Sequence, residues 1–317
     1  MKDVAAEQAN AGKFQNPHVT AKGETRATVA LSHPETLWFN TGTLCNITCA
    51  NCYIESSPEN DRLVYITADE VRDYLDQIDE RQWPIHEIAF TGGEPFMNPQ
   101  MIEMARAALE RDYDVLILTN AMRPMMRKHV QQGLLELVDT YGDKLTLRVS
   151  VDHWSEVLHD EERGKGAFAR TMEGMEWLRD AGIRMAVAGR TVWGESEADG
   201  RAGYEALYQS YNFKIDAHNP GMTVLFPEMD ESVEVPEITT ACWDILGKSP
   251  DAVMCSSSRM VVKRKGADKP AVLACTLLPY DREFELGTTL EQAERDVPLN
   301  HPHCAKFCVL GGASCSA

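Results

Sequence analysis

The sequence lacks several features that would place a protein in a class at once. No stretch of its 317 residues approaches the run of about 18 apolar residues that a membrane-spanning helix needs. Residues 1–22 hold no apolar segment of the kind found in secretory signals. Basic runs are absent too, and 31 Lys and Arg against 49 Asp and Glu give a formal charge of −18. We therefore expect a cytoplasmic protein that crosses no membrane and binds no nucleic acid.

The composition that remains is globular, apart from its cysteines. A hydrophobic fraction of 44% and a charged fraction of 25% argue against a disordered chain. Nine cysteines are many for a chain without a secretory context, and an odd number cannot pair completely. In such a context cysteines are better candidates for metal or redox sites than for disulfides.

Short apolar runs alternate with helical patterns through the first two thirds of the chain. Residues 1–34 are expected to form a polar N-terminal leader. Residues 35–226 contain six runs that are short and rich enough in β-branched or aromatic residues to be buried strands. These runs are Thr36–Asn40, Ile85–Phe90, Val115–Thr119, Leu145–Val151, Met185–Ala188 and Met222–Phe226.

Helices are expected between these strands. Thr67 and Glu70 form a capping box before an amphipathic pattern, and Asn98 followed by Pro99 predicts the start of a second helix. Further helices are expected at about 125–139, 168–178 and 202–211. Six strand–helix units predict a parallel sheet covered by helices, either doubly wound or an incomplete barrel, because six are too few for the usual eight-fold closure. In both architectures the site lies at the carboxyl ends of the strands.

Residues 227–317 have a different character, with seven prolines and six of the nine cysteines. We expect a small cysteine-rich module here. Cys255 and Cys275 flank two strand-like runs joined at Gly266, which predicts a hairpin with a cysteine at each end.

Three cysteines lie within eight residues directly after the first predicted strand. Cys45, Cys49 and Cys52 form a C-x₃-C-x₂-C pattern whose thiolates can converge on one soft metal centre. A zinc knuckle and three buried small side chains are the alternatives. A structural zinc needs a fourth ligand, for which no residue nearby is an obvious candidate. Three ligands suit a cubane iron–sulfur cluster with one open iron.

A second motif, combined with the cysteine pattern, gives a specific resemblance to a known family. Tyr53 follows the cysteine pattern, and Thr91-Gly-Gly-Glu94-Pro95 follows the second predicted strand. The combination resembles the signature of radical S-adenosylmethionine (SAM) enzymes, and the resemblance covers about residues 35–226. It implies a partial (β/α)₆ parallel barrel, and it implies that the three cysteines hold a [4Fe–4S] cluster whose open iron chelates SAM. The residues implied to bind SAM are Tyr53, Gly92, Gly93, Glu94, Pro95, Thr119, Asn120, Ser150, Asp152 and Arg190.

The later cysteines resemble the SPASM/Twitch extension of the same enzymes, in which a cysteine, a hairpin and a second cysteine precede an "LG.tL.eA" stretch. Here that stretch runs from Glu285 to Ala293, although the cysteine spacing that follows differs from the family's. The resemblance implies one auxiliary [4Fe–4S] cluster, and Cys242 is expected to be a packing residue. A zinc site of four cysteines is the alternative. The candidate ligands are Cys255, Cys275, Cys304, Cys308 and Cys315.

The resemblance implies an enzyme in which one electron cleaves SAM to a 5′-deoxyadenosyl radical that abstracts hydrogen from a peptide or a small molecule. Its electron would come from a donor such as flavodoxin or ferredoxin. Two other classes remain open from the residues, namely an iron–sulfur electron carrier or redox sensor and a zinc-structured binding protein. The Gly92–Pro95 motif argues against a carrier, because a carrier needs no SAM site.

Overall fold

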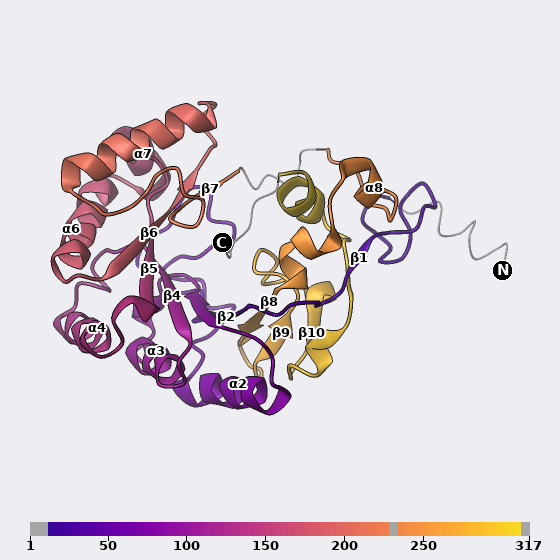
Figure 1. The fold of residues 1–317 in the computed structure, drawn as a ribbon, viewed down its shortest axis with the longest axis horizontal. Coiled ribbons are helices and arrows are strands. Elements are labelled where there is room, and N and C mark those ends of the chain that lie inside the picture. Colours follow the sequence, from indigo (N-terminus) through magenta and orange to yellow (C-terminus); the bar gives the residue numbers. More distant parts are fainter. Residues whose placement is uncertain (1–11, 228–233, 312–317) are drawn as a thin grey trace.

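The computed structural model describes residues 12–227 and 234–311, and one continuous mixed sheet dominates it (Figure 1). Its strand order is β10-β9-β8-β2-β3-β4-β5-β6-β7. Neighbouring strands from β8 and β2 through β7 are parallel, whereas β8, β9 and β10 pair antiparallel. The strands of this sheet are β2 Thr36–Asn40, β3 Glu87–Thr91, β4 Asp114–Thr119, β5 Leu145–Ser150, β6 Arg184–Arg190, β7 Thr223–Phe226, β8 Ser258–Val262, β9 Ala271–Leu273 and β10 Glu285–Gly287.

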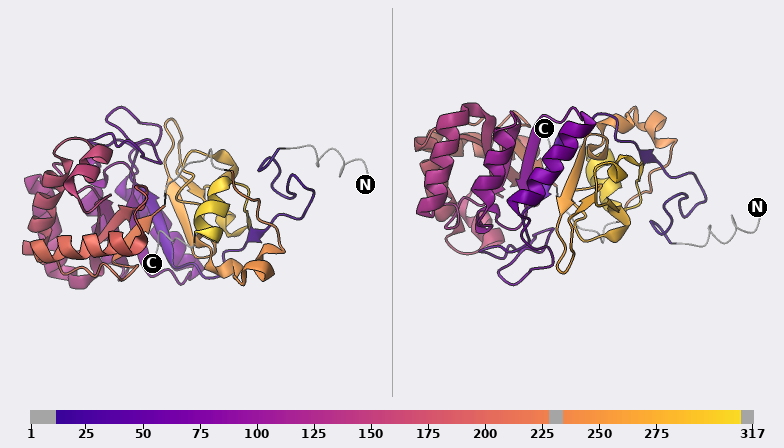
Figure 2. Two further views of the ribbon diagram at one scale, coloured as in Figure 1. Left: turned by 90° about the horizontal axis from the view of Figure 1, so that it is seen from above. Right: turned by 90° about the horizontal axis from the view of Figure 1, so that it is seen from below.

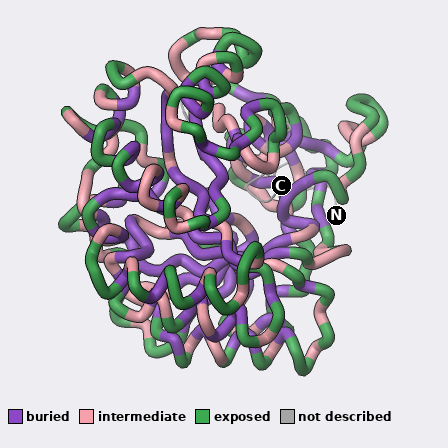
Figure 3. The backbone as a smooth tube through the Cα atoms, turned by 60° about the vertical axis from the view of Figure 1, so that its left-hand side comes forward, coloured by how far each residue is buried: buried purple, intermediate pink, exposed green. Residues whose placement is uncertain are grey.

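Helices cover the outer face of the parallel strands (Figures 1 and 2). Most strand residues are buried, whereas the outward faces of the helices are exposed (Figure 3). This pattern explains why most of the strand sequences are compact apolar runs. Strand β5 is the exception, because it alternates between apolar residues and polar residues such as Arg148 and Ser150, which line the central cavity. The helices of this layer are α2 Ala68–Arg81, α3 Met101–Leu109, α4 Lys128–Tyr141, α5 Glu156–Arg163, α6 Ala167–Asp180 and α7 Glu197–Tyr211.

The predicted partial barrel is confirmed, because β2 to β7 follow one another in the sheet and the described strands do not close into a ring. The capping box of α2 is also confirmed: the Thr67 hydroxyl accepts from the Glu70 amide, and the Glu70 carboxylate accepts from the Thr67 amide at 2.9 Å. The predicted start of α3 at Asn98 and Pro99 was wrong. The Asn98 side-chain oxygen accepts from the Gln100 amide at 3.0 Å and its nitrogen donates to the Thr41 and Ile66 carbonyls, but α3 begins only at Met101.

The C-terminal module is joined to the barrel through the sheet itself. Strand β8 extends the parallel sheet beyond β2, from Thr36 opposite Ser258 to Phe39 opposite Val261. The expected hairpin is present, since β8 and β9 are antiparallel. The module also contains α8 Cys242–Leu246, β11 Val297–Pro298 and a π-helical turn Cys304–Leu310.

Residues 12–34 lie against this module. Strand β1 Thr28–Val29 pairs antiparallel with β11, and Ala27 and Val29 are fully buried. Arg26 forms a buried ion pair with Glu237 at 2.5 Å. The domain boundaries at residues 34 and 226 stay predictions. No helix in the described ranges has the length and apolar character needed to cross a bilayer.

Candidate active site

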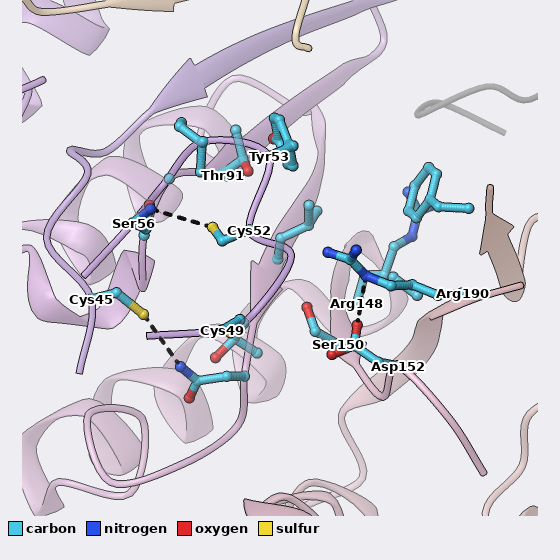
Figure 4. Close-up of a pocket in the computed structure, with 18 of the residues that line it drawn as sticks. Cys45, Cys49, Cys52, Tyr53, Ser56, Thr91, Arg148, Ser150, Asp152 and Arg190 are labelled. Atoms are coloured by element: carbon cyan, nitrogen blue, oxygen red, sulfur yellow. Dashed lines mark hydrogen bonds and ion pairs between the residues drawn. The ribbon is translucent and has the colours of Figure 1, made fainter. Parts of the chain in front are cut away.

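A cavity lies at the carboxyl edge of the parallel strands and is lined partly by the C-terminal module. Trp38, Leu118, Arg148 and Ala188 line it from inside the barrel, and Phe307 lines it from the module. Figure 4 shows the cysteine loop on one side of this cavity and the ends of β5 and β6 on the other. The cavity therefore lies where the parallel architecture predicts a site.

The structure brings Cys45, Cys49 and Cys52 together at this cavity, since all three line it. Their loop is closed at its base, where the Cys45 amide donates to the Ser57 carbonyl at 3.0 Å. The Cys52 sulfur accepts from the Ser56 amide at 3.3 Å. The chain between these contacts is short, so the three sulfurs are confined to one side of the cavity.

Helix α5 fastens the far end of the cysteine loop. The Glu162 carboxylate accepts from the backbone and the side-chain amide of Asn51, both at 2.8 Å, and the Glu162 carbonyl accepts from the Ala50 amide. Arg190 donates to the Asn51 carbonyl at 2.7 Å. Asn51, which lies between Cys49 and Cys52, is thus held by two elements of the barrel.

Burial favours the protonated thiol at Cys45 and Cys49 when no metal is bound. It raises the pKa of Cys45 to about 12, against a lowering hydrogen bond from the Ile47 backbone. It raises the pKa of Cys49 to about 11, although Arg163 opposes it. Because thiolate is the form that binds metal, iron binding at these cysteines would release protons.

The two glycines after β3 pack against the segment that leads into Cys45. A Cβ on Gly92, whose φ is +149°, would lie 2.5 Å from the Gly42 carbonyl oxygen. A Cβ on Gly93 would lie 2.2 Å from the Leu44 oxygen. The Gly93 amide donates to the Gly42 carbonyl at 2.8 Å. The motif therefore needs glycine for its contact with the cysteine loop, and Gly92, Gly93 and Pro95 also line the cavity.

Glu94 is turned away from the cavity surface. It is 1% exposed, and its carboxylate accepts from the Thr119 hydroxyl at 2.9 Å and the Asn120 amide at 2.8 Å. Burial raises its pKa to about 7 despite these bonds. Glu94 thus ties the loop after β3 to the end of β4, and its predicted contact with SAM stays a prediction.

The other predicted SAM contacts, from Tyr53 to Arg190, all line the cavity. The Asp152 carboxylate is bound by Arg163 and lies 3.3 Å from Arg190. Burial alone would raise the pKa of Asp152, but the two guanidinium groups lower it below its usual value. The cavity-lining residues among these are Tyr53, Thr119, Asn120, Ser150, Asp152 and Arg190.

Arg163 and Glu162 were missed from the sequence. Both come from α5, a short helix between β5 and α6 that was not predicted. Arg163 lines the cavity, where Asp152 and Cys49 raise its pKa against the effect of burial. Neither residue belongs to a motif, and only the fold brings α5 beside the cysteine loop.

The residues around this cavity suit a polar ligand next to a cluster. Three thiols face it, and Trp38 Nε1 and Ser56 Oγ are buried without a hydrogen-bond partner among the described residues. Buried polar atoms normally have partners. A bound ligand at this place would supply them.

The later cysteines also gather at one place. Cys255, Cys275, Cys304 and Cys308 line a second, small apolar cavity inside the module. Burial raises the pKa of Cys255 to about 11, and burial with the nearby Cys275 raises that of Cys304 well above its usual value. Cys315 lies outside the described residues. Cys242 lies apart on α8, where its sulfur contacts Thr239.

Neither group forms a tight single-ion site. In the part of the chain that the structure describes, no three or more His, Cys, Asp or Glu side chains are placed to hold one metal ion. In a [4Fe–4S] cluster each thiolate binds a different iron, so its ligand sulfurs lie farther apart than those around one ion. The four-cysteine cavity and the three-cysteine loop supply the donors such clusters take.

Fold and cavity together define a class: an open parallel α/β barrel that presents a three-cysteine loop at the carboxyl ends of its strands, with a cysteine-rich module beside it. The sequence model of the radical SAM superfamily matches residues 39–199, which is about half of the chain. The chain belongs to the radical SAM superfamily. A [4Fe–4S] cluster and SAM are the cofactors of this superfamily, and the resemblance predicted from the sequence is confirmed.

Similarity to individual proteins extends beyond the residues of the family match. The antilisterial bacteriocin subtilosin biosynthesis protein AlbA of Bacillus subtilis is 32% identical over 280 residues, 81% of this chain and 58% of AlbA. An AdoMet-dependent heme synthase of Methanosarcina barkeri is 30% identical over 141 residues, 43% of this chain and 37% of that protein. The chain thus spans little more than half of AlbA and about a third of the synthase.

The fold is also that of a solved structure. Streptococcus suis SuiB bound to S-adenosylmethionine superposes with a TM-score of 0.57 at 13% identity, covering 89% of this chain and 68% of SuiB. SuiB has also been solved with its precursor peptide SuiA. This coverage includes the module, so the arrangement of barrel and module recurs in SuiB.

Proposed function

We propose that this protein is a radical SAM enzyme that modifies a peptide. The observation that carries the proposal is the convergence of Cys45, Cys49 and Cys52 on the cavity at the carboxyl ends of the strands, beside the glycine motif. The chemistry that a [4Fe–4S] cluster and SAM supply when bound is one-electron cleavage of SAM and abstraction of a hydrogen atom. A cytoplasmic location and a donor such as flavodoxin or ferredoxin belong to the same proposal.

In this proposal the chain's own residues bind, orient and shield. The three cysteines hold the cluster, and Glu162 and Arg190 fix the loop that carries them. The residues that would bind SAM are those of the predicted set that line the cavity, and they come from the cysteine loop and the ends of β3 to β6. Phe307 and Leu277 of the module cover that cavity and help to exclude water, which protects a reactive intermediate from side reactions.

A peptide is favoured over a small molecule by the extent of the similarities. AlbA, a bacteriocin biosynthesis protein, aligns with 81% of this chain, and SuiB, which was solved with a precursor peptide, superposes on 89%. The heme synthase match covers only 43%. The two similarities that cover most of this chain, to AlbA and to SuiB, therefore favour peptide modification.

We further propose that Cys255, Cys275, Cys304 and Cys308 hold one auxiliary [4Fe–4S] cluster. Four thiols around one apolar cavity match the ligand number of such a cluster. Cys315, the fifth candidate ligand from the sequence, would then either not bind the auxiliary cluster or replace one of these four cysteines.

The proposal is tested by SAM cleavage in anaerobically reconstituted protein reduced with dithionite. The wild type should be brown and release 5′-deoxyadenosine, whereas Cys49→Ala should release none, because two thiolates cannot retain the cluster. Cys242→Ala is the matched control and should behave as the wild type. A colourless protein with stoichiometric zinc, or wild-type cleavage by Cys49→Ala, would refute the proposed function.

The same preparations separate the two clusters and identify the substrate. Cys275→Ala should lose about half of the iron and still cleave SAM, because only the four-cysteine cavity is changed. Precursor peptides encoded beside the gene, prepared with deuterated residues, should transfer deuterium to 5′-deoxyadenosine. Transfer from a deuterated porphyrin and from none of the peptides would contradict the peptide assignment.

A further inference from the structure

A hollow on the outer side of the cysteine loop is basic, although the protein as a whole is strongly acidic. We call it the basic hollow, and no acidic side chain is among the residues that line it. It faces Asn46 and Ile47 of the cysteine loop and the segment that leads into α4. Its lining residues are Asn46, Ile47, Met97, Met122, Arg123, Pro124, Arg127 and Arg170.

The three arginines of the basic hollow are available to a partner. Arg123, Arg127 and Arg170 are exposed, and none of them forms an ion pair with a residue that the structure describes, although Arg170 also donates to the Lys165 carbonyl at 3.0 Å. Some exposed arginines elsewhere pair with carboxylates, as Arg72 does with Asp69 and Glu103. With a net charge of −18, the chain repels acidic molecules over most of its surface.

The basic hollow lies one layer of residues away from Cys45. Asn46 and Ile47 line it, and both contact the Cys45 sulfur, the first through its side chain at 4.0 Å and the second through its backbone amide. Ile47 also lines the central cavity. The cysteine loop is therefore the wall between the two, with the predicted cluster on one side and the arginines on the other.

We propose that the basic hollow is the docking surface for an acidic one-electron donor protein of the flavodoxin type. The inference rests on the proposed function and names the partner that serves the same site. One electron leaves the reduced flavin of the donor and enters the cluster, and no bond forms or breaks. A peptide substrate must enter the central cavity to meet SAM, whereas a donor needs only a close approach to the cluster, which the basic hollow provides from outside.

The arrangement also explains how an acidic donor finds one place on an acidic protein. Repulsion over the rest of the surface and attraction at three clustered arginines orient the encounter, because charge complementarity acts mainly on association rate and specificity. Docking should weaken as salt rises, since exposed charges are screened.

The test uses the full chain with Arg123→Glu, Arg127→Glu and Arg170→Glu combined. Its matched control reverses three exposed basic residues far from the hollow, Arg184→Glu, Lys214→Glu and Arg282→Glu. SAM cleavage is driven either by enzymatically reduced flavodoxin or by dithionite, and binding of oxidised flavodoxin to the immobilised protein is measured separately at low ionic strength.

With flavodoxin, the triple variant should cleave SAM at least about tenfold more slowly than the control at subsaturating donor, and it should bind oxidised flavodoxin correspondingly more weakly. With dithionite, both variants should match the wild type. Equal flavodoxin-driven rates in the two variants would overturn the docking site. An equal loss with dithionite would also overturn it, because the arginines would then serve the cluster loop or the substrate.

The docking inference and the proposed function fail in different ways. A wild type that releases no 5′-deoxyadenosine with dithionite refutes the function, yet the binding measurement needs no turnover and still decides the docking site. Unchanged flavodoxin binding by the triple variant refutes the docking site even if SAM is cleaved.

Discussion

Glu162 offers a direct test of how the cysteine loop is held. Its carboxylate is 4% exposed and accepts two hydrogen bonds of 2.8 Å from Asn51, midway between Cys49 and Cys52. In Glu162→Ala both bonds are lost. A hydrogen bond to a charged group contributes about 1.5–3 kcal/mol, but Asn51 is exposed, so water replaces part of the loss. We expect the variant to lose about 2 kcal/mol of loop stability.

The loss of loop stability in Glu162→Ala is measured from the reactivity of the loop thiols in the protein without its cluster. A loop that opens more easily by about 2 kcal/mol is open about 30 times as often, because 1.4 kcal/mol corresponds to a factor of ten. Alkylation of Cys49 and Cys52 by iodoacetamide, followed by peptide mass spectrometry, should therefore accelerate by about that factor. Iron retained after reconstitution should fall as well.

The neighbouring Glu161→Ala is the control, because Glu161 is exposed and its side chain forms no hydrogen bond or ion pair with another described residue. Asn51→Ala removes the same contact from the other side, so the double variant should show less than additive acceleration, with a coupling of about 1 kcal/mol. Equal alkylation rates in Glu162→Ala and Glu161→Ala would show that α5 does not hold the loop.

Two further predictions follow from other buried groups. Gly93→Ala should destabilise the protein by about 1–3 kcal/mol in chemical unfolding, because its Cβ would meet the Leu44 oxygen at 2.2 Å; an unchanged midpoint would refute the packing. His159 is fully buried, and burial lowers its pKa to about 4. The unfolded chain thus binds a proton before the folded one does, so stability should fall by on the order of 3 kcal/mol as the pH drops from about 6.5 to about 4. His159→Phe should remove this component, and an identical pH profile would contradict it.

The barrel strands were predictable because most of their residues are buried. Such strands read as compact apolar runs, and the six runs from Thr36–Asn40 to Met222–Phe226 all overlap strands of the sheet. The start of α3 was predicted too early from Asn98, because its side-chain oxygen accepts from the Gln100 amide in a turn that precedes the helix. Local capping rules do not distinguish such a turn from the first turn of the helix.

In the candidate site, too, residues in local motifs could be predicted from the sequence, whereas residues placed by distant contacts could not. Motif spacing found the three cysteines and the glycine loop, since each motif is a continuous segment that ends at the cavity. Arg163 and Glu162 could not be found, because α5 is short and carries no motif, and its role arises only when the fold brings it to Asn51 and Asp152. Their discovery required the tertiary structure.

The two cysteine groups are related by the way the module joins the barrel. Leu277 lines both the central cavity and the four-cysteine cavity, and Phe307 and Cys308, adjacent in sequence, line one each. The wall between the cavities is therefore a single layer of side chains. Because β8 pairs with β2 as a further parallel strand, this layer is fixed to the barrel by backbone hydrogen bonds. An auxiliary cluster held by these four cysteines would have no open iron to bind a substrate, but across this layer it could accept an electron from a substrate in the central cavity. The distance between the two cysteine groups is therefore set by the pairing of β8 with β2.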